Sequence, residues 1–287
     1  MSGRGRHYRG NRNRNQQTLS SVARETAASL APDSLVLVMF RAAAGKLNDR
    51  QDRHERLVKL SRDITMESKR IIFLLHSAIT EEATKKAVED ANDRLKKLIN
   101  GSLKAIGIEL ENSPAYLHSR AVTAGFQEFI EARTLCSLME KKVIIPYEDV
   151  QNELTYKITE EVDGIETERT VVTMMPHGDY MLGIADLTGE LMRRAINTIS
   201  SGDSAECVHV CQVVRDLYTG YLGLFSMGKE LCRKINVTRA NVAKVEGAVY
   251  ALHVRGGEAP LTHIVPQTTL QQDWDNSTHL SDDEGYY

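Results

Sequence analysis

Two pairs of acidic residues are spaced so that each pair projects from one face of a helix. Glu128 and Glu131 lie three residues apart in an apolar segment, on the seam where a bundle helix normally places apolar side chains. Asp186 and Glu190 lie four residues apart in a second segment, so they also share a face. Burying unpaired carboxylates is unfavourable, so we expect a cation or a paired arginine to compensate the first pair.

Inward-facing acids on neighbouring helices are one way in which helical bundles build metal sites. No histidine accompanies the four acids, and all-oxygen ligation favours Mg²⁺ or Mn²⁺ over zinc or iron. Such a site can lower the pKa of a bound water molecule and hold a phosphodiester for in-line attack. The pattern alone leaves two interpretations open, a metal site or acids that are solvated or salt-bridged. The second interpretation is stronger for Asp186 and Glu190, because Arg193 and Asn197 share or border their face.

Signatures of other chemistry are weak. The sequence contains no glycine-rich phosphate loop and no nucleophile elbow. Cys207, His209 and Cys211 are spaced like a ligand cluster, but on a helix the histidine points away from the two thiols. Core packing is therefore the favoured interpretation of these residues, and we expect no small-molecule cofactor.

Basic residues concentrate where they suit contact with nucleic-acid phosphates. The first 20 residues carry no acid, and their arginines are Arg4, Arg6, Arg9, Arg12 and Arg14. Arg53 and Arg56 belong to a second basic stretch, and Arg193 lies beside the second acidic pair. Dispersed positive charge of this kind favours salt-sensitive binding of single-stranded RNA. A solubilising tail and a solvated helix face explain the same composition.

Long helices are needed to position these residues, and the sequence predicts an all-α fold. Only six prolines occur in 287 residues, and apolar residues recur at helical spacing along most of the chain. The expected helices span 33–79 (one long helix or two stacked end to end), 81–111, 115–141, a short segment after Pro146, 179–200, 203–220, 222–235 and 238–254. Asp203 and Thr238 are the expected N-caps of two of them. The expected architecture is an antiparallel bundle of about seven helices with short connections.

The sequence departs from helical periodicity around Asp163-Gly164. These two residues separate short runs that contain Tyr156, Val162 and Ile165, an arrangement that suits a tight β-hairpin turn. A polar loop is nevertheless the favoured interpretation, because an isolated hairpin is only marginally stable.

Composition limits the class of protein. No apolar run approaches the ~18 residues of a membrane-spanning helix, and the N-terminus does not resemble a signal peptide. The four cysteines suit reduced core thiols. We therefore expect a soluble protein of the cytoplasm or nucleus that makes no membrane contact. The expected domains are a disordered Arg/Gly/Asn-rich arm over 1–30, a helical domain over 31–258 and a disordered acidic tail over 259–287.

Four long segments carry a resemblance to a known family. They are RHERLVKLSRDITMESKRIIFLLH (53–76), FQEFIEA (126–132), DYMLGIADLTGELMRRAIN (179–197) and KVEGAVYALHVRGGE (244–258). They closely resemble the factor X branch of the translin family, and the resemblance covers roughly residues 33–260.

The resemblance implies a fold, a partner and an activity. The family fold is an all-α, translin-like bundle. Factor X proteins pair with translin, a related RNA-binding protein, in a hollow hetero-oligomer that is a Mg²⁺-dependent endoribonuclease. That complex degrades the nicked passenger strand during activation of the RNA-induced silencing complex and takes part in tRNA processing. The factor X subunit supplies its active site.

The acidic motifs of the family fall on the two pairs described above. QE-x-x-E matches Gln127 to Glu131, and DLTGE matches Asp186 to Glu190. The resemblance therefore implies that Glu128, Glu131, Asp186 and Glu190 bind Mg²⁺ or Mn²⁺ and form the catalytic site. Two other functions stay open, a scaffold that stabilises translin and binds RNA without cutting it, and a helical adaptor for protein partners. Convergence of the acids within reach of one ion favours the enzyme, whereas arginine pairing or dispersal to solvent favours the others.

Overall fold

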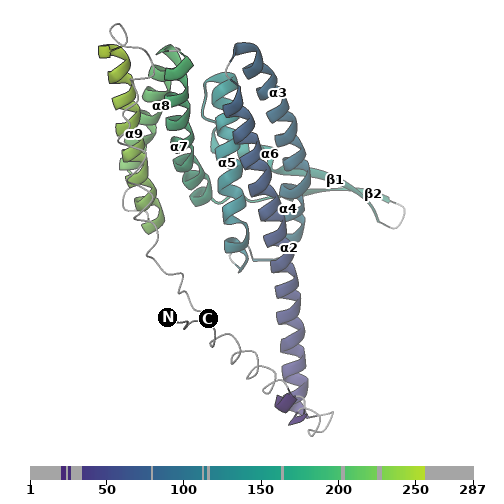
Figure 1. The fold of residues 1–287 in the computed structure, drawn as a ribbon. Helices are drawn as coiled ribbons and strands as arrows, with labels where there is room; N and C mark the ends of the chain where they lie inside the picture. Colours follow the sequence, from purple (N-terminus) through teal and green to yellow (C-terminus); the bar gives the residue numbers. More distant parts are fainter. Residues whose placement is uncertain are drawn as a thin grey trace, which may run out of the picture. The chain divides into compact units, whose positions relative to one another are not determined.

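The computed structural model of the chain is almost entirely helical over the residues that it describes (Figure 1). These are residues 21–23, 25–26, 34–78, 80–111, 113–114, 117–162, 165–201, 204–224 and 228–255. In chain order the elements are α2 (Leu35–Ser77), α3 (Glu81–Leu98), a π-helical turn η1 (Ile99–Leu103), α4 (Lys104–Leu110), α5 (Ser119–Lys141), α6 (Tyr147–Glu153), β1 (Thr155–Val162), β2 (Ile165–Val172), α7 (His177–Ser201), α8 (Ser204–Leu222) and α9 (Lys229–Arg255). The chain divides into two compact units, residues 1–56 and 57–287, and both acidic pairs belong to the second.

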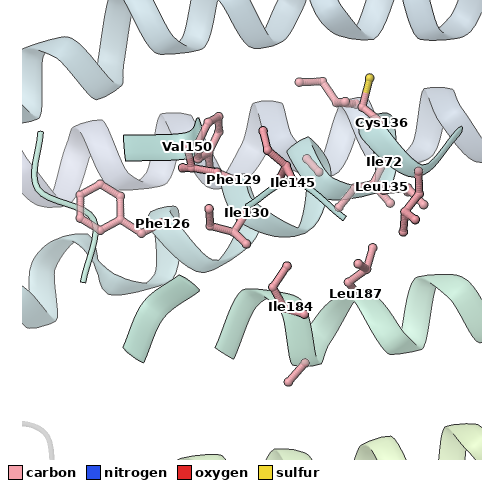
Figure 2. Packing of buried hydrophobic residues seen from close by; sticks show 14 of the residues in the cluster. Ile72, Phe126, Phe129, Ile130, Leu135, Cys136, Ile145, Val150, Ile184 and Leu187 are labelled. Atoms are coloured by element: carbon pink, nitrogen blue, oxygen red, sulfur yellow. The ribbon is translucent and has the colours of Figure 1, made fainter. Parts of the chain in front are cut away.

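The predicted all-α class is confirmed, and α5 lies at the centre of the second unit. Phe126, Phe129 and Ile130 are almost completely shielded from solvent. Figure 2 shows Ile130 of α5 on the side of Ile184 and Leu187, which belong to α7. The apolar periodicity of residues 115–141 therefore reflects packing on several sides, rather than a single amphipathic face.

Gly183 brings α7 unusually close to α5. A Cβ atom at this position would lie 2.7 Å from the carbonyl oxygen of Gln127 and 2.8 Å from Cβ of Ile130. A real side chain does not fit at these distances, so only glycine permits this approach of the two helices. The contact lies beside Glu128 on α5, and it sets the spacing between the two helices that carry the acidic pairs.

The C-terminal helix corrects one expectation from the sequence. Thr238 was expected to cap a separate helix, but α9 runs without a break from Lys229 to Arg255. The hydroxyl oxygens of Thr238 and Thr188 lie 3.4 Å apart, and Asn241 donates a hydrogen bond of 3.1 Å to Thr188. Thr238 is fully buried, so its hydroxyl is satisfied by a partner on α7 and not by capping the backbone.

The polar loop expected around Asp163-Gly164 is also wrong, because β1 and β2 form an antiparallel ribbon with Thr155 opposite Val172. The ribbon is not isolated. Its base is buried at Tyr156 and Val171, and the Thr173 hydroxyl donates a 2.8 Å hydrogen bond to the carbonyl of Leu103. Tertiary contacts with η1 and α4 supply the stability that an isolated hairpin lacks.

The remaining expectations from the sequence concern the cysteines, a helix cap and the two ends of the chain. Cys207 and Cys211 are free, buried thiols, as the core interpretation predicted. Asp203 lies outside the described residues, as do most of the expected N-terminal arm and the whole of the expected tail. None of the helices in the described ranges is both long and apolar enough to cross a membrane.

Replacing Gly183 with alanine is expected to lower the free energy of unfolding by about 1–3 kcal/mol, because the added methyl group overpacks a filled helix interface. Gly247→Ala in α9 is the matched control. A Cβ there would meet no atom within 4 Å, so alanine should stabilise the helix by up to about 1 kcal/mol. Urea denaturation followed by circular dichroism measures both changes. A Gly183→Ala variant as stable as wild type would contradict the close approach of α5 and α7.

Candidate functional site

Glu128, Glu131, Asp186 and Glu190 form an acidic cluster between α5 and α7. Each of these helices contributes two of the acids, and the Gly183 contact holds the helices side by side at this level. Glu131 is the most buried member, with 9% of its surface exposed. The negative charges of the other three carboxylates all act on it. The structure therefore brings together two pairs of acids that lie about fifty residues apart in the sequence.

Glu131 has an unusual electrostatic environment. Burial and the three neighbouring carboxylates raise its pKa to about 8, although Lys234 partly opposes this effect. Within the described part of the chain, no basic side chain forms an ion pair with Glu131. When this carboxylate is ionised, its charge is therefore compensated only indirectly, and a further cation in the cluster would stabilise it.

The other three acids each have a basic partner. The ion pairs are Lys69–Glu128 at 3.1 Å, Lys234–Asp186, His76–Glu190 at 2.7 Å and Arg193–Glu190 at 3.2 Å. Lys69 and His76 lie seven residues apart, two turns along one side of α2, and this places α2 across both acidic pairs. Lys234 reaches the cluster from α9. Four helices thus converge on the cluster.

Glu190 is influenced by burial first and by His76 second. Burial alone would raise the pKa of Glu190, but the hydrogen bond from His76 and the charge of Arg193 hold it below the ordinary value. Both side chains of the His76–Glu190 pair are largely buried, whereas Arg193 is exposed. Two carboxylates of the same cluster therefore have pKa values displaced in opposite directions.

Sequence reasoning placed Arg193 beside the second acidic pair but missed the other basic partners of the cluster, which are Lys69, His76 and Lys234. The heptad spacing of Lys69 and His76 on one predicted helix was a usable signal, because it places both residues on a single face. Lys234 gave no such signal, since the sequence predicted that its helix ends at residue 235.

Asp179 anchors the first turn of α7 to α5. Its carboxylate accepts hydrogen bonds of 3.0 Å from the Gln127 side chain and 3.2 Å from the Thr123 hydroxyl. Burial raises the pKa of Asp179, and the two hydrogen bonds oppose that rise. Gln127, the first residue of the QE-x-x-E motif, therefore joins the helices and does not point into the acidic cluster.

The predicted RNA-binding arginines are distributed over several regions. Arg193 lies beside the acidic cluster and is exposed. Arg53 and Arg56 lie on α2 within the unit formed by residues 1–56. The other five lie outside the described residues; they are Arg4, Arg6, Arg9, Arg12 and Arg14.

A cavity of about 770 Å³ adjoins the cluster. His76 lines the cavity and also contacts Glu190. Two of the cations that line the cavity, Lys142 and Arg194, are both paired with Glu206, which offsets their positive charge. The acidic cluster and its exposed rim are thus the better candidates for phosphate chemistry.

The cluster contains the type of ligand that a magnesium site uses, but its carboxylates are not arranged around a single ion. Across the described ranges, no three His, Cys, Asp or Glu side chains are arranged to hold one metal ion as they stand. Three of the carboxylates instead face their basic partners. Although the sequence predicted a cluster without histidine, His76 lies against Glu190. The four carboxylates nevertheless supply the oxygen donors that Mg²⁺ and Mn²⁺ prefer.

Comparison with known proteins identifies the family. A sequence profile described as the translin family matches residues 52–256. Translin-associated protein X of Mus musculus is 35% identical over 263 residues, which cover 88% of this chain and 90% of that protein. The chain belongs to the translin family. The resemblance carried by the four sequence segments is thereby confirmed.

More distant translin-family proteins show the same relationship. The translin-associated protein X homolog of Schizosaccharomyces pombe is 27% identical over 214 residues, 73% of this chain and 84% of that protein. Translin of Homo sapiens is 28% identical over 112 residues, only 39% of this chain and 49% of that protein. The similarity to the factor X branch is thus longer than the similarity to translin.

Solved structures show that the fold is translin-like. AfC3PO in a duplex RNA complex has a TM-score of 0.58 and 17% identity, covering 77% of this chain and 100% of that chain. Apo-NeC3PO has a TM-score of 0.51 and 19% identity, covering 76% of this chain and 96% of that chain. At these identities the likeness concerns the fold alone.

The raised pKa of Glu131 predicts how stability depends on pH without divalent metal. The unfolded chain releases this proton near pH 4.5 and the folded chain near pH 8. The stability contributed by the proton is complete below pH 4.5 and is lost as the pH rises to about 8. The loss is up to about 5 kcal/mol. Unfolding at pH 5 and pH 8 in a chelating buffer should show a steeper loss for wild type than for Glu131→Gln.

Glu140→Gln is the control for this measurement, because Glu140 is an exposed acid near the end of the same helix. It should keep the pH dependence of wild type. Equal slopes for wild type and Glu131→Gln would show that Glu131 is not buried among like charges.

Proposed function

We propose that the chain is the catalytic subunit of a metal-dependent endoribonuclease that cleaves single-stranded RNA in a complex with translin. The observation that carries the proposal is the acidic cluster. Glu131 is buried without a direct counter-ion among the residues that the structure describes, and the charges of three more carboxylates from α5 and α7 act on it. Such crowding of like charges is unfavourable unless it serves a cation. The similarity to translin-associated protein X and the helical fold shared with an RNA-bound C3PO support the same proposal.

Glu128, Glu131, Asp186 and Glu190 would hold Mg²⁺ or Mn²⁺. When bound, the ion would supply a Lewis acid that makes a water molecule nucleophilic and offsets negative charge on the scissile phosphate. Binding requires Lys69 and Lys234 to release Glu128 and Asp186, with which they form ion pairs. One carboxylate of the cluster would accept the proton released by the attacking water.

The basic groups on the rim would bind and orient the RNA backbone. Arg193 and Lys69 are both more than half exposed and lie beside the acids, so they are placed to contact phosphates on either side of the scissile bond. Arg53, Arg56 and the arginines of the N-terminal arm would supply further contacts with phosphates. Binding through phosphates is indifferent to sequence and weakens as the salt concentration rises.

A non-catalytic RNA-binding scaffold is the second candidate function. The ion pairs favour it, because Glu128, Asp186 and Glu190 are already neutralised by side chains of the chain itself. In that case the cluster would only join four helices. An adaptor for protein partners would use the same ion pairs and bind no RNA. Cleavage by variants of the acids separates these readings.

The cellular role follows from the factor X resemblance and forms part of the proposal. The complex would remove the nicked passenger strand during activation of RNA silencing and would process tRNA, in the cytoplasm and the nucleus. In both settings the substrate is RNA with a single-stranded segment that can be drawn away from a duplex.

Glu128→Gln and Asp186→Asn are expected to reduce RNA cleavage at least about 100-fold, because each removes a carboxylate ligand without changing side-chain shape. Assembly with translin, and RNA affinity measured without divalent metal, should stay close to wild type. The measurement is cleavage of a labelled single-stranded RNA by the purified complex, with Mg²⁺ and with EDTA. Glu140→Gln, on the exposed face at the end of α5, should cut at the rate of wild type.

The cleavage products report the mechanism independently. Attack by water leaves a 5′-phosphate and a 3′-hydroxyl, whereas attack by the 2′-hydroxyl of the RNA leaves a 2′,3′-cyclic phosphate. Full activity of Glu128→Gln or Asp186→Asn would support the scaffold. Cyclic phosphate products would place the reaction in a different chemical class, even with the site correctly assigned.

The first turns of α2 provide a surface that suits the proposed partner. Val36, Val38, Met39 and Phe40 are all more than half exposed, as is Leu35. A run of exposed apolar side chains is typical of a protein interface. Because translin is a helical relative of this chain, we infer that it covers this run by helix packing.

The isolated chain is therefore expected to aggregate, and co-expression with translin should make it soluble. Phe40→Glu should weaken assembly at least about tenfold, because it places a charge in an apolar contact. Phe40→Leu keeps the surface apolar and should assemble normally. Size-exclusion chromatography with light scattering measures the assembly. A stable monomer at high concentration, or normal assembly of Phe40→Glu, would argue against this surface.

A further inference from the structure

Lys234 enters the acidic cluster from a different helix than any of the acids. Its ammonium group forms an ion pair with Asp186, and its charge also acts on Glu131. The Lys234 side chain is 24% exposed. The Lys69 side chain, which pairs with Glu128 on the rim, is 64% exposed. Of these two lysines, Lys234 is the one that solvent screens less, so its charge has the larger effect inside the cluster.

The position of Lys234 is fixed by the packing of α9 on α7. Ile235, the next residue, is 2% exposed. One turn further along α9, Thr238 meets Thr188, two residues after Asp186 on α7. A buried polar contact of this kind holds the two helices in a single register. The base of the lysine side chain is therefore held in place, and only its flexible carbon stem can move.

Lys234 and a divalent ion would compete for the Asp186 carboxylate. The ammonium group contacts Oδ1 of Asp186, so a divalent ion bound to the same carboxylate would lie beside a second cation. Two cations on one carboxylate repel each other strongly where water is partly excluded. Metal binding therefore favours an exchange, in which the ammonium group leaves Asp186 as the ion arrives.

The displaced ammonium group remains next to the site. Because α9 is held against α7, the group can move by no more than the reach of its own stem, and it loses its carboxylate partner in doing so. A scissile phosphate bound at the same ion would bring negatively charged oxygens within that reach. Lysine is a mobile point charge that suits phosphate of any orientation.

We propose that Lys234 is an internal counter-ion that neutralises Asp186 until a divalent metal ion displaces it, and that it then binds a phosphate oxygen of the RNA. The inference rests on the proposed function of the acidic cluster as a metal site. It adds a coupling between metal binding and RNA binding, because the metal ion releases the Lys234 ammonium group to bind phosphate. The metal-free site is thereby kept from binding RNA productively.

The test compares Lys234→Met with Lys69→Met in the full-length chain assembled with translin. Methionine keeps the length of the side chain and removes its charge. Mn²⁺ affinity, measured from the electron paramagnetic resonance signal of free Mn²⁺, should rise at least about tenfold in Lys234→Met, because the competitor is gone. It should rise less than about threefold in Lys69→Met, because solvent screens that exposed charge.

RNA affinity should change in the opposite direction. Binding of a fully phosphorothioate single-stranded RNA, which resists cleavage, is measured by fluorescence anisotropy with and without Mn²⁺. Lys69→Met should bind RNA more weakly than wild type with and without Mn²⁺, because Lys69 belongs to the proposed RNA-binding rim, but its affinity should rise by the same factor as that of wild type when Mn²⁺ is added. In Lys234→Met this factor should be at least about fivefold smaller. Tighter metal binding combined with a smaller metal-dependent gain in RNA affinity is not expected of a lysine that only stabilises the fold.

The outcomes separate this inference from the function on which it rests. If wild type binds Mn²⁺ and Asp186→Asn abolishes that binding, but Lys234→Met behaves like Lys69→Met, the inference fails and the metal site stands. If neither wild type nor Lys234→Met binds Mn²⁺, both fail. Circular dichroism checks the fold of each variant, and Lys234→Gln replaces Lys234→Met if the methionine variant does not fold.

Discussion

Without a side chain at Gly183, α7 lies against the backbone of α5 beside Gln127, and this contact places the two acidic pairs opposite one another. Apolar packing on both sides of the contact keeps it closed. Ile130 and Ile184 are buried where the two helices meet (Figure 2), and each such side chain contributes roughly 1.5–3 kcal/mol. This favourable term is what allows like charges to be brought together between the same helices.

The positive charges in the cluster are distributed unevenly over its four acids. Three acids are neutralised by basic side chains, while Glu131 depends on charges that do not contact it directly. A purely structural network would be expected to pair its most buried member first, because desolvation penalises that charge most. Here the most buried acid is the one that no basic side chain of the described residues contacts directly.

Much of this arrangement could be predicted from the sequence, because it follows from helical periodicity. The three-residue and four-residue spacings place each acidic pair on one face, and apolar repeats predict the helices that carry them. Local patterns indicated a hairpin turn at Asp163-Gly164 but could not decide for the β1–β2 ribbon, since its stability comes from contacts of Tyr156 and Thr173 with distant parts of the chain. The break expected at Thr238 failed for the same reason, because a buried partner on α7 replaces the cap.

The basic partners lie beyond the reach of sequence patterns for a different reason. Lys69 and His76 come from α2, and Lys234 comes from α9, so the acids of the two middle helices are balanced by helices near opposite ends of the described chain. No short segment contains both an acid and its partner, except for Glu190 with Arg193. The charge balance therefore exists only after the whole bundle has closed, and a chain truncated before α9 would leave Asp186 and Glu131 without Lys234. The site is therefore complete only when all four helices are in place.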